Sequence, residues 1–256
     1  MQKSMSNLST SGNQQIILLL NSWHDILQDV FVFEESMRHL SLEQQARILK
    51  KKSHPDRCKA LCNQLLQITG ISMATGLPHT QLNFQYGVCG KPLVIDIDAL
   101  TFSMSDGEHY VAQYIFKAKG YEVGIDLAST SDYCGDQDLN HFVEIFSLQE
   151  FKNLVQCPSS KKALLFTYIW SLKECYSKFT GLGLNSKLHN INFGKLDLFD
   201  TETTLKRRID QKEMFFYSCW IAPGEVVTVC HESNPLLDQN PHVYYLTLQD
   251  VLSELQ

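Results

Sequence analysis

Hydrophobic residues along the chain follow two patterns: short apolar runs typical of buried strands, and longer stretches with apolar residues at helical spacing. The run from Gln15 to Trp23 predicts a first strand. Ser41-Leu-Glu-Gln44 is a capping-box pattern, so we expect a short helix to begin there. A second helix is expected to start at Ser53-His-Pro-Asp56, with proline early in its first turn, and its apolar spacing predicts an end at Gly70.

The middle of the chain, from Gly87 to Val123, is mainly of strand character. Strands are predicted at Leu100–Met104 and at His109–Phe116, with Asp106-Gly107 forming the turn between them. The polar segment Lys117–Gly120 then indicates a boundary between two halves.

The second half begins with a predicted strand over Tyr121–Asp126. Ser147-Leu-Gln-Glu150 is another capping box, and Pro158-Ser-Ser160 starts a long helix that is expected to end near Gly181. Further strands are expected at Gly194–Phe199, Met214–Trp220, Val226–Cys230 and His242–Thr247, followed by a C-terminal helix.

This order of elements predicts three segments. They are a flexible tail over residues 1–14, a first half over 15–118 and a second half over 119–256. Each half runs from a strand through helices to further strands, which indicates an α+β fold.

Polar residues within the apolar elements indicate chemistry. The long helix carries Lys173, Glu174 and Lys178, and the strand before it ends on a single carboxylate, Asp126. Two acids from separate elements can hold one hard cation, and lysines can bind phosphates. The combination therefore points to a diphosphate substrate.

Simpler interpretations of the same residues remain open at this point. Glu174 and Lys178 are four residues apart, which is also the spacing of an ordinary ion pair on a helix surface. Asp126 by itself would more often be a residue that ends a strand and caps a turn. In the first half, Arg57 lies in a predicted first helical turn, where a cation and unpaired backbone N–H groups together favour an anion.

Composition narrows the class of protein. A chain of 256 residues with 44% hydrophobic residues can bury one sizeable core or two modest ones. The net charge of -6 argues against a surface that coats nucleic acid, and no apolar run approaches membrane-spanning length. The eight cysteines form no zinc-binding pattern, so we expect reduced thiols in a cytoplasmic protein.

Four motifs in order resemble the 4′-phosphopantetheinyl transferases of the long, Sfp-like type. The motifs are Gly90-Lys-Pro92, Phe102-Ser-Met-Ser105, Gly124-Ile-Asp126 and Trp170-Ser-Leu-Lys-Glu174 through Lys178. The resemblance covers residues 41 to 200 and is nearest to the eukaryotic branch that activates aminoadipate reductase in fungal lysine biosynthesis.

The resemblance implies two similar α+β halves related by a pseudo-twofold axis, with coenzyme A bound in the cleft between them. It also implies the reaction. A carrier-domain serine attacks the β-phosphorus of coenzyme A, the phosphopantetheine arm moves to that serine, and 3′,5′-ADP leaves.

The resemblance also implies roles for individual residues. Asp126 and Glu174 are the expected ligands of Mg²⁺, or of Mn²⁺, and Glu174 is the candidate base. Lys173 and Lys178 are expected to bind the diphosphate. Arg57, Lys91 and Ser105 match positions that bind the adenosine and 3′-phosphate end of coenzyme A.

Two positions depart from the family pattern. Many members carry a second acid two residues after the first, where this chain has Ala128. A histidine often follows the serine, where this chain has Asp106. An aspartate there would repel the 3′-phosphate unless it turns away or pairs with Arg57 or Lys91.

The expected partners are coenzyme A and an apo carrier domain, from aminoadipate reductase, fatty-acid synthase or another carrier protein. We expect a monomer. Two rival functions are a non-catalytic coenzyme A-binding protein on the same fold, and an enzyme that acts on another nucleotide diphosphate. Coenzyme A binding without transfer would favour the first, and turnover without a carrier would favour the second.

Overall fold

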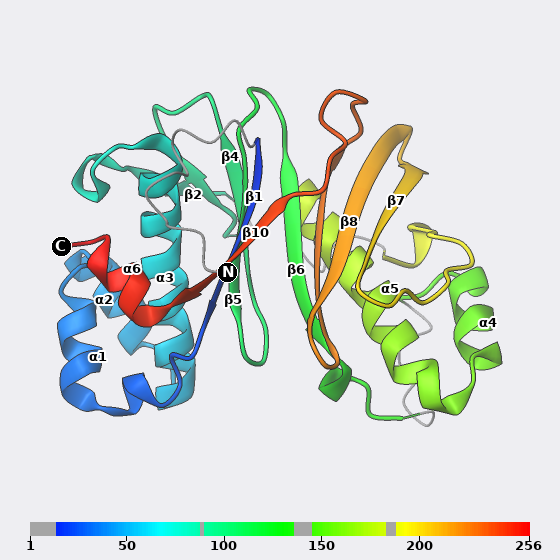
Figure 1. Cartoon of the computed structure of the whole chain (residues 1–256), viewed down its shortest axis with the longest axis horizontal. Helices are drawn as coiled ribbons and strands as arrows, with labels where there is room; N and C mark the ends of the chain where they lie inside the picture. The colour runs from blue at the N-terminus through cyan, green and yellow to red at the C-terminus, as the bar shows by residue number, and fades with distance from the viewer. Residues whose placement is uncertain (1–13, 88–89, 136–144, 183–187) are drawn as a thin grey trace. The chain divides into compact units, whose positions relative to one another are not determined.

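The computed structural model describes residues 14–87, 90–135, 145–182 and 188–256 (Figure 1). The chain divides into two compact units. Unit 1 contains the described part of residues 1–85 together with Pro92–Lys119 and Pro241–Gln256, and unit 2 contains Tyr86–Lys91 and Gly120–Asn240. The tail predicted for residues 1–14 lies almost entirely outside the described residues.

Unit 1 is a four-stranded sheet with helices packed on it (Figure 1). The strand order is β10-β1-β5-β4, in which β1 is antiparallel to β5 and parallel to β10. The strands are β1 (Gln15–Asn21), β4 (Thr101–Asp106), β5 (Val111–Phe116) and β10 (His242–Thr247). The helices are α1 (Val30–Met37), α2 (Leu42–Leu49), α3 (His54–Thr75) and α6 (Leu248–Ser253). Two short strands, β2 (Phe84–Tyr86) and β3 (Pro92–Val94), pair separately.

Helix α3 continues past the glycine that was expected to end it. Its N-cap Ser53 accepts a hydrogen bond from the backbone N–H of Asp56, and the helix ends at Gly76, which has a left-handed φ of 74°. Gly70 lies within the helix. A Cβ at this position would be 1.8 Å from Oε1 of Gln113 on β5, which explains why the residue is a glycine. The glycine therefore marks a close helix–sheet contact and not a helix end.

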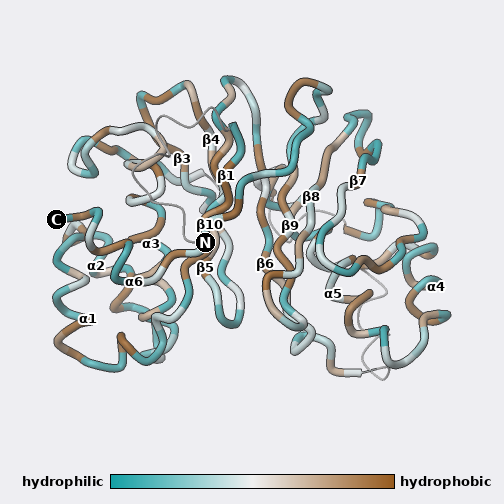
Figure 2. Tube along the Cα trace, in the orientation of Figure 1, coloured by the Kyte–Doolittle hydropathy of each residue, from teal (hydrophilic) through white to brown (hydrophobic). Residues whose placement is uncertain are grey.

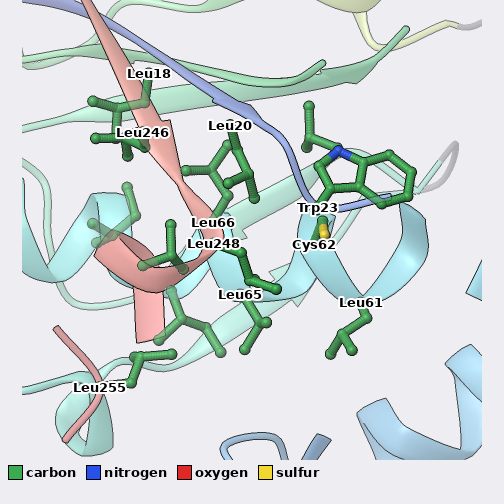
Figure 3. Packing of buried hydrophobic residues seen from close by; sticks show 14 of the residues in the cluster. Leu18, Leu20, Trp23, Leu61, Cys62, Leu65, Leu66, Leu246, Leu248 and Leu255 are labelled. Carbon is green, nitrogen blue, oxygen red and sulfur yellow. The ribbon is translucent and has the colours of Figure 1, made fainter. Parts of the chain in front are cut away.

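The C-terminal segment belongs to unit 1, although it was expected in the second half. β1 is a continuous hydrophobic stretch (Figure 2), and β10 pairs along its outer edge, with Ile16 opposite His242. Leu246 and Leu248 then pack beside Leu65 and Leu66 of α3 in one apolar cluster (Figure 3). Burial of these leucines explains why the chain returns to the first strand.

Unit 2 is an antiparallel four-stranded sheet that packs against a long helix. Its strand order is β6-β9-β8-β7. The strands are β6 (Val123–Ser129), β7 (Glu202–Ile209), β8 (Lys212–Ala222) and β9 (Glu225–Glu232), and the helices are α4 (Leu148–Gln156) and α5 (Ser159–Thr180). Single 3₁₀ turns among the described residues are η2 (Ile26–Gln28), η3 (His79–Gln81), η4 (Thr130–Asp132) and η7 (Leu188–Asn190).

The strand predicted at Gly194–Phe199 is wrong. This segment has no regular structure, although Leu196 is buried in the core of unit 2. The strand lies later, at Glu202–Ile209, where exposed and partly buried residues alternate along the edge of the sheet. Its few apolar residues explain why the pattern did not reveal it.

The two units share one arrangement, which confirms the predicted two similar α+β halves. α2 and α4 each begin with a serine capping box, at Ser41 and Ser147. α3 and α5 each span 22 residues and end at a left-handed glycine, Gly76 and Gly181. In unit 1, β1 pairs with β5 and β5 with β4, all antiparallel. In unit 2, β6 pairs with β9 and β9 with β8 in the same way. Among the described helices of both units, none has the length and hydrophobicity needed to cross a membrane.

Candidate active site on strand β6 and helix α5

A glycine allows β6 and α5 to approach closely. A Cβ on Gly124 would be 2.0 Å from the carbonyl oxygen of Cys175 and 2.9 Å from the backbone nitrogen of Phe179. Cys230 lies opposite Gly124 on β9, and its thiol donates to the same Cys175 carbonyl over 3.6 Å. The backbone of α5 therefore rests directly on the sheet at this point.

Asp126 lies two residues after Gly124 and points to the same face of the sheet, toward α5. Its Oδ1 is 2.8 Å from Nζ of Lys178. The Asp126 side chain is 7% exposed, whereas that of Lys178 is 31% exposed. The strand thus supplies a buried carboxylate, and the helix supplies a cation that reaches solvent.

Glu174 lies one helical turn before Lys178 and brings a second carboxylate to the same place. Burial and the nearby charge of Asp126 raise the pKa of Glu174, while the ammonium of Lys178 lowers it. Its Oε1 is buried, and no hydrogen-bond partner for this atom lies within the part of the chain that the structure describes. Such an atom is suited to contact a cation.

The donor set fits a magnesium ion that also contacts its substrate. Mg²⁺ prefers oxygen ligands and is commonly held by one or two carboxylates together with phosphate oxygens and water. The described ranges contain no group of three or more His, Cys, Asp or Glu side chains that could hold a metal ion by themselves. Ala128, which lies two residues beyond Asp126 and is buried, is consistent with a site of two protein carboxylates.

Lys173 lies elsewhere, although it is adjacent to Glu174 in sequence. Its ammonium is fully buried and contacts Oε2 of Glu150 at 2.8 Å, the carbonyl oxygen of Leu188 at 2.9 Å and that of Ile191 at 2.6 Å. These three acceptors satisfy its three N–H donors. Burial lowers the pKa of Lys173, and the attraction of Glu150 offsets this only in part. The expectation that Lys173 binds phosphate is therefore corrected to a structural role.

Glu150 was not recognised from the sequence as more than a capping residue. Its Oε2 also accepts from the backbone N–H of Ser147, and its Oε1 accepts from that of Phe193. The carboxylate thus joins the start of α4, the middle of α5 and the segment around Phe193. The capping box located Glu150 at the helix start but gave no sign of its partner on α5.

Comparison with known proteins identifies the family of the chain. Residues 122–230, which include Asp126, Glu174 and Lys178, match the family model of the 4′-phosphopantetheinyl transferase superfamily. An L-aminoadipate-semialdehyde dehydrogenase-phosphopantetheinyl transferase from Saccharomyces cerevisiae is 41% identical over 244 residues, which cover 92% of this chain and 89% of the relative. The chain belongs to the 4′-phosphopantetheinyl transferases.

Further relatives come from other organisms. A protein of the same description from Candida glabrata is 34% identical over 88% of this chain and 86% of its own length. The 4′-phosphopantetheinyl transferase Sfp of Bacillus subtilis is 22% identical over 77% of this chain and 84% of its own length. The resemblance read from the four motifs is thereby confirmed, and the chain is an enzyme of this family.

Lys91, one of the residues expected at the coenzyme A end, lies in unit 2 and not in the predicted first half. Its ammonium contacts Oε2 of Glu122 at 2.7 Å and the carbonyl oxygen of Val123 at 3.0 Å. Its side chain is 14% exposed. Lys91 therefore lies beside the start of β6, the strand that carries Asp126.

Arg57 and Ser105 belong to unit 1, whereas β6 and α5 belong to unit 2. Arg57 is in the first turn of α3, as predicted, and its Nε donates to the carbonyl oxygen of Lys51 over 2.9 Å. Ser105 is buried on β4.

Asp106, the departure beside Ser105, is held by α3. Nδ2 of Asn63 donates to its Oδ1 over 3.1 Å, and Nζ of Lys59 is 3.9 Å from its Oδ2. Asp106 therefore pairs with Lys59, a partner not among the alternatives considered from the sequence, which were that Asp106 turns away or pairs with Arg57 or Lys91. Lys59 on α3 thus offsets the negative charge of Asp106, which would otherwise repel an anion.

Proposed function

We propose that this transferase moves the 4′-phosphopantetheine group of coenzyme A to a serine of a carrier domain, with Mg²⁺ or Mn²⁺ held by Asp126 and Glu174. The observation that carries the proposal is the grouping of the buried carboxylate of Asp126 and the partly buried carboxylate of Glu174 with one partly exposed ammonium, that of Lys178. Cleavage of the diphosphate of coenzyme A needs this combination, because negative charge grows on the oxygens of the departing 5′-phosphate as the bond breaks.

The residues of the chain have distinct tasks in this reaction. Lys178 contacts a diphosphate oxygen, and its partly exposed side chain gives it access to one. Glu174 accepts the proton of the carrier serine, directly or through a water, because its raised pKa suits a general base better than that of an ordinary carboxylate. The serine oxygen forms a bond to the β-phosphorus, and the bond from that phosphorus to the departing 3′,5′-ADP breaks. The cation, when bound, neutralises the charge that develops on the leaving group.

The other end of coenzyme A is assigned to Arg57, Lys91 and Ser105. Arg57 supports this assignment through its place in the first turn of α3, where backbone N–H groups favour an anion. Lys91 supports it less strongly, because Glu122 already holds its ammonium. We keep Lys173 out of the phosphate-binding set because its donors are all satisfied.

The carrier we propose is the carrier domain of aminoadipate reductase, which would give the enzyme a role in lysine biosynthesis. The names of the relatives from Saccharomyces cerevisiae and Candida glabrata support this carrier. Fatty-acid synthase and other carrier proteins are the alternative acceptors. Every cysteine among the described residues is free, which supports a reducing compartment such as the cytoplasm, and we propose a monomer.

The test is intact-mass spectrometry of an apo carrier domain incubated with the enzyme, coenzyme A and Mg²⁺. We expect a mass gain of one phosphopantetheine group. EDTA should abolish it by removing the metal, because the carboxylates that remain are themselves negative and cannot neutralise the charge on the leaving group. Asp126→Asn and Glu174→Gln should each reduce the rate by at least about a hundredfold. Asp197→Asn, a matched change at an exposed carboxylate, should not. Full activity in either site variant would contradict the assignment.

A further inference from the structure

The ion pair between Lys178 and Asp126 suggests a second task for the lysine. We propose that Lys178 is an internal counter-ion that occupies Asp126 when no metal is present, and that it transfers to the diphosphate of coenzyme A as the metal takes its place. The inference rests on the proposed function and concerns how the site is loaded. It makes metal and coenzyme A binding cooperative through a side chain of the protein.

The need for a counter-ion follows from the burial of Asp126. Its side chain is 7% exposed, and a buried carboxylate without a partner is costly. Nζ of Lys178 is 2.8 Å from Oδ1, which is the distance of a charge-assisted hydrogen bond. Lys178 therefore supplies positive charge at the atom where a metal would bind.

The charge of the site favours replacement of the lysine by a stronger cation. Asp126 and Glu174 carry two negative charges, and Lys178 supplies one positive charge. Oε1 of Glu174 is buried, and the described residues provide it with no hydrogen bond. A divalent ion can contact both carboxylates at once, and the ammonium of Lys178 donates to Oδ1 of Asp126, the atom for which such an ion would compete.

Lys178 is able to move away because of its position. The lysine has a flexible stem of four carbons, and its side chain is 31% exposed. A diphosphate offers the ammonium a new anionic partner at the moment when the metal displaces it from Asp126. Each ligand therefore favours the other, and thermodynamic linkage makes that effect equal in both directions.

The test measures Mn²⁺ binding to the enzyme without coenzyme A, by the electron paramagnetic resonance signal of unbound Mn²⁺. Lys178→Met keeps the length of the side chain and removes the competing charge. We expect it to bind Mn²⁺ about tenfold more tightly than the wild type, a change within the usual range of coupling between ligands. Coenzyme A should then raise Mn²⁺ affinity less in Lys178→Met than in the wild type, because the lysine no longer has to be displaced.

Two further variants control the experiment. Lys212→Met removes an equal charge from a lysine that pairs with Glu232 and lies over the ring of Phe179 on α5, so we expect no change in Mn²⁺ affinity. Lys178→Arg keeps the charge and can bind the carboxylate with two N–H groups, so we expect weaker Mn²⁺ binding than in the wild type. Circular dichroism verifies that each variant is folded.

The outcomes separate this inference from the proposed function. Equal Mn²⁺ affinity in the wild type, Lys178→Met and Lys178→Arg would overturn the counter-ion role, even if the wild type modifies the carrier domain. An equal gain in Lys178→Met and Lys212→Met would overturn it too, because the effect would then be one of general charge. Absence of transfer by the wild type to any carrier would instead contradict the proposed function.

Discussion

Lys173 and Lys178 lie on one helix but in opposite environments. The ammonium of Lys173 is enclosed by Glu150 and two carbonyl oxygens, whereas Lys178 pairs with Asp126 at a partly exposed position. The five-residue spacing turns the second lysine well away from the first around the helix. One motif therefore combines a residue that fixes the helix in place with one that we propose contacts the substrate.

Replacement of Lys173 by methionine should destabilise the protein strongly. The change leaves the fully buried carboxylate of Glu150 without its cation, and breaking a buried pair in this way costs about 3–5 kcal/mol. The free energy of unfolding, from urea titration followed by circular dichroism, measures the loss. Lys195→Met, at an exposed lysine of the same unit, should change it by no more than about 0.5 kcal/mol. A similar small effect at Lys173 would contradict the role assigned to the pair.

The sequence singled out Asp126, Glu174 and Lys178, because polar residues within apolar elements stand out, and the structure brings the three together. Their roles in the reaction stay a prediction. The sequence could not distinguish the environment of Lys173 from that of Lys178. Helical spacing gives the angle between two side chains around the helix, but not which other element packs over each of them. The partner of Lys173 is a capping residue on another helix, and that contact depends on tertiary packing. The pairing of Asp106 with Lys59 and Asn63 was hidden for the same reason.

At the scale of elements, the distance between β6 and α5 determines whether the two carboxylates meet. Gly124→Ala would place a Cβ 2.0 Å from the carbonyl oxygen of Cys175, so the helix would have to shift. We expect a loss of about 1–3 kcal/mol in the free energy of unfolding, as for other overpacked sites, together with weaker Mn²⁺ binding. Gly87→Ala is the matched control, because its Cβ would meet its nearest neighbour at an ordinary 3.7 Å. Equal effects of the two changes would show that the close approach is unimportant.

A second contact between elements connects β7 to the segment that follows β9. Asp238 accepts hydrogen bonds from Lys206 on β7 at 2.7 Å, from the Ser233 hydroxyl at 2.6 Å and from the Asn234 backbone at 2.9 Å. Burial by itself would raise the pKa of Asp238, but these bonds outweigh it and hold the pKa below the usual range.

The pH dependence of stability should reveal this contact. In the unfolded chain, an aspartate titrates near pH 3.9, roughly its reference value, whereas folded Asp238 stays ionised to lower pH. Its contribution is therefore complete above about pH 5 and is lost as the pH falls through the folded pKa. Urea midpoints should show Asp238→Asn less stable than the wild type at pH 7, with the difference shrinking by pH 3. A difference that does not depend on pH would contradict this assignment, and Asp197→Asn serves as the exposed control.

Elements with a strong periodic pattern were predicted well, and elements that depend on distant partners were not. The two capping boxes and the long helix α5 were located from local sequence. Edge strand β7 was missed because its outward residues are polar, and helix α3 was ended early because a glycine that serves a tertiary contact resembles a stop signal. For α3 the deciding contact, with Gln113 on β5, lies far away in the sequence. β7 pairs with β8, which follows it directly, so its polar composition and not a distant contact concealed it.

At the scale of the whole molecule, the last residues complete the first unit. Leu248 of α6 is fully buried in the cluster that also contains Leu65 and Leu66 (Figure 3). Leu248→Ala should lower the free energy of unfolding by about 2–5 kcal/mol, because it leaves a cavity in that core. Leu236→Ala changes a leucine that is 80% exposed and should have an effect within about 0.5 kcal/mol. A mild effect at Leu248 would indicate that the C-terminal helix is dispensable for unit 1.

The return of β10 to β1 also has a consequence for how the protein is made. Domains usually fold in the order in which they leave the ribosome, with the N-terminal one first. Here every segment of unit 2 has been synthesised by Asn240, while β1 still lacks the neighbour that pairs with its outer edge. An apolar strand with an open edge is prone to pair with other chains, so a nascent or prematurely terminated polypeptide exposes such an edge until its final residues arrive. The unit whose first strand is made earliest is thus the last to be completed. Chaperones that shield hydrophobic strands are needed most in that interval.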